Sequence, residues 1–290
     1  MSNDDQLKVR QTVSKKKSFK ELTIVRDIIF WIDLVGEGQN ENAIFARPFN
    51  EKEAFPQKLT SKKYNIKNNF HGYGGRSYKC IYLKNNFYLI WIDQITNAVW
   101  FQIFKEVASN FRSQKRYLDS VQEPRQLSKS IDGNFDSSFV ISQKNFLYGI
   151  CEINNRDYLF SLNLKKTKQD IYRIKKFKNF AGELSSNTSV SLLSWVEWDS
   201  PYMPWEKNDL CFAQIDLDGE ITKIKKFSDK LINAKKNVSF FQPYWISETL
   251  LVCSEDSSGW WNLLFLDVSE IENIFIKKRV ERNLIEYGAP

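Results

Sequence analysis

Leu89-Ile90-Trp91-Ile92-Asp93 is an apolar run that ends in an acidic residue, and this pattern recurs along the chain. β-Branched and aromatic residues are enriched in strands, so each run predicts a short strand. The acidic ends of the runs are 60, 59, 45 and 58 residues apart. The five runs are Ile28–Asp33, Leu89–Asp93, Tyr148–Glu152, Leu193–Glu197 and Leu250–Glu255.

A turn and a second aromatic stretch follow each run, so the sequence repeats a hairpin. A hairpin unit that recurs every roughly 40–60 residues is typical of propeller blades, which are small sheets that bury two apolar faces by stacking on their neighbours. The sequence therefore predicts an all-β fold, an incomplete β-propeller of about five blade-like units. A β-sandwich with coincidental spacing is the alternative on the repeat alone. The second stretches are Ala43–Phe49, Ala98–Phe104, Asp157–Leu164, Asp209–Leu217 and Trp261–Val268.

The composition is that of a globular chain. Its 290 residues are 42% hydrophobic and 15% aromatic, which suffices for a packed core and argues against disorder. A formal charge of +7 allows weak attraction to polyanions, but nucleic-acid binding needs lysines gathered on one face with exposed aromatics. We expect lysines at strand ends on a solvated surface and no nucleic-acid partner, which leaves a nucleic-acid binder as the weakest alternative. The clusters are Lys15–Lys17, Lys165–Lys168, Lys175–Lys178, Lys225–Lys226 and Lys277–Arg279.

The four cysteines, Cys80, Cys151, Cys211 and Cys253, are far apart, and each lies in or beside an apolar run. They form no CxxC pair, and one histidine, His71, adds too little for a zinc site. We therefore expect buried reduced thiols, no metal and no cofactor. Reduced thiols favour a reducing compartment, so the predicted location is cytoplasmic.

The predicted organisation is a polar, lysine-bearing N-terminal arm over residues 1–20 and a partial β-propeller domain over residues 21–290. The first apolar stretch, Leu22–Val35, is interrupted by charges at Arg26, Asp27 and Asp33. A signal peptide needs an uncharged apolar stretch, and a membrane span needs about 20 apolar residues. No membrane association is expected.

Three segments are more specific than the repeat, namely H-G-Y-G-G-R-S-Y (71–78), W-V-E-W-D-S-P-Y-M-P-W (195–205), and F-Q-P-Y-W (241–245) with D-S-S-G-W-W-N-L (256–263). They resemble, in the same order, H-E-Y-G-G-G-x-Y, W-x-x-W-D-H-P-N-M-P-W, and F-Q-P-x-W with D-R-S-G-W-W-N-L of the prolyl-oligopeptidase family of serine peptidases. The most similar subgroup is the bacterial dipeptidyl-aminopeptidase and acylaminoacyl-peptidase-like enzymes. The resemblance spans roughly residues 25–290 and covers the non-catalytic propeller of that family.

The motif residues are expected to be structural. Gly74-Gly75 is expected to supply positive φ at a turn, and Trp198, Trp205, Trp260 and Trp261 are expected to stack between blades. The full set is His71, Tyr73, Gly74, Gly75, Trp195, Trp198, Asp199, Pro201, Met203, Pro204, Trp205, Gln242, Pro243, Trp245, Asp256, Gly259, Trp260, Trp261 and Asn262.

Three positions depart from the family pattern. Gly72 stands where the family usually has Glu, Ser200 where it has His, and Ser257 where it has Arg. These departures put in doubt any substrate-binding role of the three loops.

Catalytic residues are missing from the sequence. A peptidase of this family needs a serine in a G-x-S-x-G elbow, followed by Asp and then His. No serine here has glycines at that spacing, and the only histidine, His71, lies within the first propeller motif. We therefore assign no catalytic residue, expect the catalytic hydrolase domain to be absent, and expect no enzyme activity from the chain alone.

The resemblance implies the non-catalytic, substrate-gating propeller part of a truncated or split prolyl-oligopeptidase-like peptidase. The expected partner is a separate catalytic hydrolase chain, or a second copy through self-association at open blade edges. Peptides are expected only in the context of the full enzyme. A stand-alone propeller that acts as a protein-interaction scaffold is the alternative.

Overall fold

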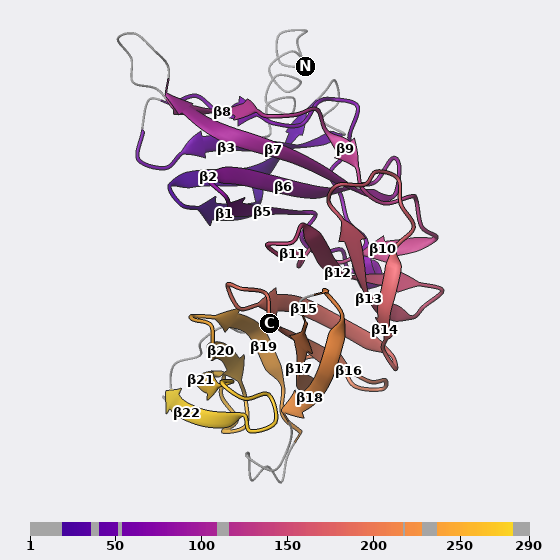
Figure 1. Ribbon diagram of the computed structural model, residues 1–290, viewed down its shortest axis with the longest axis vertical. Coiled ribbons are helices and arrows are strands. Elements are labelled where there is room, and N and C mark those ends of the chain that lie inside the picture. Colours follow the sequence, from indigo (N-terminus) through magenta and orange to yellow (C-terminus); the bar gives the residue numbers. More distant parts are fainter. Residues whose placement is uncertain are drawn as a thin grey trace, which may run out of the picture. The chain divides into compact units, whose positions relative to one another are not determined.

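The computed structural model of the chain describes residues 19–35, 41–51, 54–108, 116–216, 218–227 and 237–280. The chain divides into two compact units, Met1–Ser130 and Ile131–Pro290, and both consist of antiparallel sheets (Figure 1). Apart from the short 3₁₀ turn η1 (Phe70–Gly72), the described residues form no helix. The prediction of an all-β fold is confirmed.

Most of the predicted N-terminal arm, including Lys15–Lys17, lies outside the described residues. Its last residue, Lys20, begins the first strand.

The first unit contains two sheets. The first sheet has the order β1 (Lys20–Val25), β2 (Ile28–Val35), β3 (Glu41–Pro48) and β4 (Gln57–Lys58). The second sheet has the order β5 (Tyr78–Leu83), β6 (Asn86–Asp93), β7 (Ala98–Ala108) and β8 (Arg116–Ser120), with β9 (Arg125–Gln126) also paired to β7.

The second unit contains three more sheets of the same design. The third sheet has the order β10 (Gly133–Phe135), β12 (Phe146–Ile153), β13 (Asp157–Asn163) and β14 (Tyr172–Lys176), with β11 (Val140–Ile141) also paired to β12. The fourth consists of β15 (Phe180–Ser186), β16 (Leu192–Trp198), β17 (Asp209–Ile215) and β18 (Ile221–Phe227). The fifth consists of β19 (Phe240–Trp245), β20 (Leu250–Glu255), β21 (Asn262–Asp267) and β22 (Phe275–Val280).

Every recurrent run in the sequence is the second strand of a sheet. The runs are β2, β6, β12, β16 and β20, and the stretches that follow them are the third strands β3, β7, β13, β17 and β21. The prediction of five blade-like units is therefore confirmed. The sequence pattern did not reveal the first and fourth strands. The fourth strands lie at a sheet edge and carry more exposed polar residues, which hides their apolar pattern.

The acidic residue at the end of each run has a local physical cause. A carboxylate can accept hydrogen bonds from the turn that joins the second and third strands. Asp93 accepts bonds from the backbone N–H of Thr96 at 3.0 Å and of Asn65 at 2.8 Å, and it is fully buried. Glu255, also fully buried, accepts one from the N–H of Ser257 at 2.8 Å. In these two sheets the acidic end of the run therefore braces the hairpin turn, whereas Glu197 of β16 is bound by Trp195 and Lys175.

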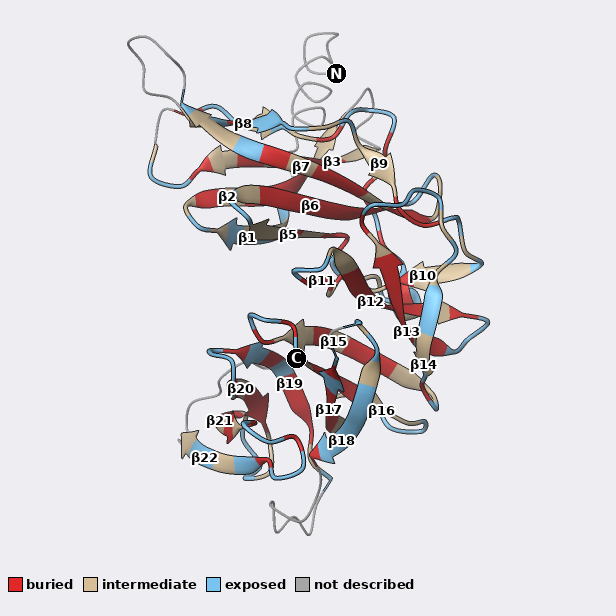
Figure 2. Cartoon of the chain, viewed as in Figure 1, coloured by how far each residue is buried: buried red, intermediate tan, exposed pale blue. Residues whose placement is uncertain are grey.

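The second strand β6 is buried on both faces, and Figure 2 shows it mostly in red. Leu89, Ile90 and Trp91 of β6 are each fully buried. In the first unit, one core joins the first and second sheets, with Phe30 and Phe87 5.8 Å apart. In the second unit, another core joins the fourth and fifth sheets. In each of these two pairs, one sheet supplies one wall of the core and its neighbour the other.

The fourth strands of the second unit carry most of the predicted lysine clusters. The tripeptide Ile-Lys-Lys occurs in each, at 174–176 in β14, 224–226 in β18 and 276–278 in β22. Several of these lysines are paired, for example Lys226 with Asp209 at 2.7 Å. Lysine at an exposed sheet edge disfavours pairing with another strand. This placement fits the expected solvated surface.

All four cysteines are free and buried, as expected from the sequence. Burial raises the thiol pKa of each one above its usual range. Among the described residues, no helix has the length and apolar character needed to cross a membrane.

Removal of a core ring shared by two sheets should destabilise the second unit. Phe212 is fully buried, and its ring meets that of Trp245 edge-on at 6.2 Å. We expect Phe212→Ala to lower the free energy of unfolding by about 3–5 kcal/mol, measured by urea denaturation. The control is Ala in place of the exposed Ile95, which should change it by less than about 0.5 kcal/mol. Equal effects of the two changes would contradict this core.

The thiols should be inert in the folded protein. Because the thiolate is the reactive form and burial disfavours it, we expect negligible reaction of the native chain with an aromatic disulfide reagent. All four thiols should react once the chain is denatured. Rapid native reaction of any of them would show that its strand is not packed as described.

Candidate functional site

One hollow in the second unit surrounds the W-V-E-W-D-S-P-Y-M-P-W motif. It encloses about 340 Å³ beside the loop between β16 and β17. Its walls come from the segment before β15, from β15 to β18, and from the loop itself. The lining residues are Lys178, Asn179, Phe180, Glu197, Trp198, Asp199, Ser200, Tyr202, Lys207, Asn208, Asp209 and Lys226.

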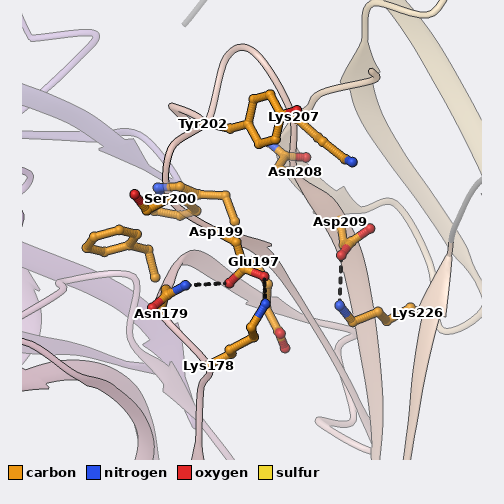
Figure 3. Close-up of a pocket in the computed structure, with 12 residues that line it drawn as sticks. Lys178, Asn179, Glu197, Asp199, Ser200, Tyr202, Lys207, Asn208, Asp209 and Lys226 are labelled. Carbon is orange, nitrogen blue, oxygen red and sulfur yellow. Dashed lines mark hydrogen bonds and ion pairs between the residues drawn. The ribbon is translucent and has the colours of Figure 1, made fainter. Parts of the chain in front are cut away.

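Four of the six charged residues of this pocket form two ion pairs (Figure 3). Asp199 accepts hydrogen bonds from Lys178 Nζ at 2.6 Å and from Asn179 Nδ2 at 2.9 Å. Lys226 Nζ donates to Asp209 at 2.7 Å. Three carboxylates and three lysines line the pocket, so its formal charge is balanced. The net charge of the pocket therefore gives no preference for an anionic ligand over a cationic one.

Glu197, the acidic end of β16, is held from two sides. The indole Nε1 of Trp195 donates to its Oε1 at 2.8 Å, and Lys175 Nζ of the third sheet lies 3.1 Å from the same oxygen. One carboxylate therefore joins two neighbouring sheets.

Aromatic rings form the apolar part of the pocket wall. Phe180 and Trp198 stack with centroids 5.7 Å apart and an interplanar angle of 20°. At the rim, Lys207 Nζ lies 5.3 Å from the centroid of the Tyr202 ring. Such a wall can hold a small polar or zwitterionic group against an apolar face.

Buried Asn208 fixes the loop. Its Nδ2 donates to the carbonyls of Pro204 and Phe240, each at 2.8 Å, and its Oδ1 accepts from the N–H of Phe240 at 2.7 Å. The peptide bond between Ser200 and Pro201 is cis. The bonds between Asn208 and Phe240 tie the loop that carries the end of the motif to β19 of the next sheet.

Two protonation states in the pocket are shifted toward the charged form. Burial alone would raise the pKa of Asp199, but the bonds from Lys178 and Asn179 outweigh it and lower the pKa. Burial would lower the pKa of Lys226, but its bond to Asp209 outweighs burial and raises it. Groups held in their charged form at neutral pH suit recognition and are poorly suited to general acid–base catalysis.

In the first unit, the motif H-G-Y-G-G-R-S-Y forms η1 and the turn that leads into β5. Gly72 and Gly74 have φ of 76° and 83°, whereas Gly75 does not have a positive φ. The expectation for the Gly74-Gly75 pair is therefore correct for Gly74 and wrong for Gly75. Gly72, which replaces the family's Glu, supplies the second left-handed position. His71 has φ 52°, and its ring lies against that of Phe70.

A glutamate at a bulge in β1 holds the end of this motif. Glu21 has φ 53° at a register shift between Lys20 and Thr23. Its carboxylate accepts from Ser77, the Oγ at 2.9 Å and the N–H at 2.5 Å, and its carbonyl accepts from Tyr78 Oη at 2.7 Å. Glu21 therefore latches the first sheet to the start of the second.

The same latch recurs between the fourth and fifth sheets. Glu183 has φ 58° at a bulge in β15, and its carboxylate accepts from the N–H of Gln242 at 2.6 Å. Gln242 itself has φ 54° at the bulge of β19. We call Glu21, Glu183 and Gln242 the bulge residues.

The third motif braces the hairpin turn between β20 and β21. Gly259, with φ 89°, donates its N–H to the carbonyl of Asp256 at 2.8 Å. Asn262 Nδ2 donates to Ser258 Oγ at 2.8 Å and to the carbonyl of Trp260 at 3.1 Å. Asp256 Oδ1 accepts from the N–H of Ser239 at 2.8 Å, which ties the turn to the segment before β19.

The motif tryptophans behave in two ways. Trp205 and Trp260 are 47% and 39% exposed, so a large part of each ring faces solvent, and the expectation that they stack between blades stays a prediction. The contact that crosses sheets comes from Trp245, whose Nε1 donates to Ser194 Oγ of β16 at 3.0 Å. Trp198 stacks on Phe180 of its own sheet and also packs against the core between the fourth and fifth sheets. Trp261 meets the ring of Phe241 in its own sheet.

Sequence reasoning missed several residues of these sites. The pocket residues Lys178, Asn179, Lys207 and Lys226 lie outside the motif, and two of them were seen only as parts of lysine clusters. Glu21 and Glu183 were not singled out at all. Their only signal is a single acidic residue in a short strand, shortly before a recurrent run.

A catalytic or metal centre is not seen in the described part of the chain. Those residues contain no group of three or more His, Cys, Asp and Glu side chains that could hold a metal ion. The pocket at the second motif is lined by a serine, Ser200, and by no histidine.

No family model matches the sequence, and no curated protein matches it. Solved structures do match. A puromycin-hydrolysing peptidase of Mycobacterium tuberculosis matches with a TM-score of 0.68 at 17% identity, over 91% of this chain and 39% of that chain. A puromycin hydrolase matches with a TM-score of 0.69 at 16% identity, over 88% of this chain and 38% of that chain. Prolyl oligopeptidase B from Galerina marginata matches with a TM-score of 0.52 at 9% identity, over 94% of this chain and 39% of that chain.

The chain has a β-propeller fold. The five sheets are its blades, and the propeller is incomplete. This confirms, at the level of the fold, the resemblance to the propeller part of prolyl-oligopeptidase-type peptidases. The propeller spans about two fifths of the length of the peptidases that it matches.

The latch at Glu21 should give the propeller a specific pH dependence. Burial raises the pKa of Glu21 above the usual glutamate value of 4.5, against the opposing effect of the bonds from Ser77. The folded state therefore binds the proton more tightly than the unfolded state. The stability that this proton contributes is complete below pH 4.5 and is lost as the pH rises through the folded-state pKa.

Glu21→Gln keeps the size and an acceptor for Ser77 but cannot lose a proton. We expect its free energy of unfolding, measured by urea denaturation across a pH series, to lack this decline above pH 4.5. Glu123→Gln, at an exposed position, is the control and should retain the wild-type profile. Parallel profiles for the wild type and Glu21→Gln would contradict a buried latch.

Proposed function

We propose that the chain is the non-catalytic propeller part of a prolyl-oligopeptidase-like peptidase, truncated or split from its hydrolase domain. In that setting it would restrict entry to the hydrolase active site to peptides. The observation that carries this proposal is the fold match over about nine tenths of this chain to under two fifths of the peptidase chains. The three motifs, in the family's order, support the same assignment.

The chemistry of the chain supports a non-catalytic role. Acyl transfer by this class of enzyme needs a serine activated by a histidine, with donors for the oxyanion. The sequence has no G-x-S-x-G, and its one histidine lies in η1 next to Phe70. The pocket at the second motif carries paired charges rather than a nucleophile and a base.

A catalytic hydrolase chain is the proposed partner. Aromatic residues from each of the three motifs are exposed, including Tyr73 at 79%, Trp205 at 47% and Trp260 at 39%. Exposed Trp and Tyr residues are enriched at protein interfaces, where they supply rigid contact area. We propose that these three rings contact the hydrolase or the entering peptide. The four reduced thiols support the proposal of a cytoplasmic location.

The purified chain should not cleave peptides. We expect no hydrolysis of acyl-peptide, aminoacyl-anilide or puromycin substrates, and no labelling by a fluorophosphonate that reacts with activated serines. A labelled serine would overturn the proposal. The matched control is the same preparation mixed with the hydrolase encoded by a continuing or neighbouring reading frame, which should be labelled and active.

The exposed motif aromatics also favour a second candidate, a stand-alone interaction scaffold. The adjoining DNA separates the two. A reading frame with G-x-S-x-G followed by Asp and His supports the peptidase assignment, and its absence favours the scaffold.

A further inference from the structure

The fourth and fifth sheets of the second unit have equivalent strand pairings, so each residue of one has a counterpart in the other. The contacts of one residue therefore indicate which neighbour its counterpart can contact. Relative to the acidic ends Glu197 and Glu255, Val196 of β16 corresponds to Ser254 of β20. Their partners on the third strands are Leu210 and Leu263, respectively. Those in turn pair with Phe227 of β18 and Val280 of β22. The two rows are therefore equivalent, and each lies on the sheet face that points toward the following sheet.

In the fourth sheet this face is covered by the fifth. Val196, Leu210, Phe212 and Phe227 are between 0% and 3% exposed and belong to one core with Leu251 and Leu264 of the fifth sheet. The residues of the fifth sheet that reach this core alternate along β20 and β21, so the residues between them point to the opposite side.

The equivalent face of the fifth sheet is apolar and only partly covered. Leu250, Val252, Leu263, Phe265 and Val280 are each partly exposed, and Tyr244 is 67% exposed. We call these six residues the trailing face. A sheet face of this composition normally packs against another sheet.

A bulge residue marks the same position. Glu183 in β15 accepts a hydrogen bond from the backbone N–H of Gln242 in the sheet that follows. Gln242 is the corresponding bulge residue of the fifth sheet, and it is exposed. Its amide oxygen is placed to accept the same bond from one more sheet.

The chain itself supplies a face that fits. Counted from Asp33 and Glu255, Trp31 and Ile29 of β2 correspond to Cys253 and Leu251 of β20. In the first strands, Ile24 pairs with Ile29 as Trp245 pairs with Leu251. Cys253, Leu251 and Trp245 of the fifth sheet pack against the fourth sheet.

In the first sheet the equivalent face is open along β1, whereas Trp31 of β2 is 4% exposed and lies against Phe19, with ring centroids 6.0 Å apart. Ile24 is 51% exposed, whereas its counterpart Trp245 is 8% exposed. Leu22 and Phe19 beside it are 57% and 64% exposed, and Trp31 stacks on Phe45 at 5.9 Å. We call Phe19, Leu22, Ile24, Ile29, Trp31 and Phe45 the leading face.

We propose that the trailing face of one chain binds the leading face of a second copy, so that the chains associate head to tail. The first sheet of the second copy would occupy the position of the next blade, and Gln242 would accept from the backbone N–H of Glu21. Because two different surfaces meet, the contact is heterologous, and each chain offers both halves. The inference rests on the register of the sheets and does not depend on the proposed peptidase role.

Three variants test this contact. Phe265→Asp places a charge in the trailing face, and Ile24→Asp places one in the leading face. Ile95→Asp is the control, since Ile95 is 67% exposed in the turn between β6 and β7 and belongs to neither face. Far-UV circular dichroism checks that each variant is folded. Tyr244→Asp, at a 67% exposed position, replaces Phe265→Asp if the latter does not fold.

Sedimentation velocity over a concentration series is the measurement. The wild type and Ile95→Asp should associate, and each face variant alone should associate on the order of thirtyfold more weakly or less, the effect of losing a central aromatic or aliphatic anchor. Mixing Phe265→Asp with Ile24→Asp should restore a one-to-one complex, because the first keeps its leading face and the second its trailing face.

Three results would overturn the proposal. A wild type that stays monomeric at the highest concentration reached excludes the contact. Association that survives Ile24→Asp but not Phe265→Asp indicates two trailing faces in contact. Failure of the mixture to associate, when both variants are folded, excludes the head-to-tail arrangement.

Discussion

Burial of both faces of each second strand is the constraint on which the rest of this propeller depends. A four-stranded sheet with two apolar faces cannot bury both by itself, so each blade is stable only in contact with its neighbours. Trp91 and Trp195, which lie in the second strands β6 and β16, are fully buried for this reason. The cores between adjacent blades are correspondingly rich in Phe, Ile and Leu, and their ring pairs meet at tilted or edge-on angles.

Carboxylates perform two separate tasks in this arrangement. Those at the ends of second strands, such as Asp93 and Glu255, bind the backbone of their own hairpin turn. Those at the bulges, Glu21 and Glu183, bind the backbone of the next blade. A left-handed residue at a bulge turns its side chain out of the regular alternation of the strand. This is how one acidic residue in a first strand can reach across to a neighbouring sheet.

The sequence predicted the middle of each blade better than its edges. The pattern of Ile28–Asp33 and its four repeats is visible because a strand buried on both faces is apolar along its whole length. Strands such as β18 carry Ile, Thr and Lys with one side in solvent, and this pattern is no different from that of a loop. The bulge at Glu21 could not be read from composition, since it depends on a φ of 53° and on a partner, Ser77, far along the chain.

The motif residues were also predicted better where their role is local than where it depends on contacts with distant parts of the chain. Gly74 was expected in a turn because the backbone preference of glycine is local, and it has the positive φ of such a turn. Trp205 and Trp245 are the same residue type, yet one lies in solvent and the other reaches Ser194 in the next blade. Residue type gives the size of a side chain, whereas the strand or loop that carries it decides what it contacts.

The Ile-Lys-Lys tripeptides of β14, β18 and β22 limit the directions in which chains of this protein can associate. Their positive charges line the rims of three blades, where an unprotected strand would recruit another strand by backbone pairing. Lateral extension into wider sheets, the geometry of amyloid, is therefore opposed by charge repulsion. Addition along the stacking direction meets no such barrier, and this leaves a one-dimensional, blade-upon-blade route as the open one.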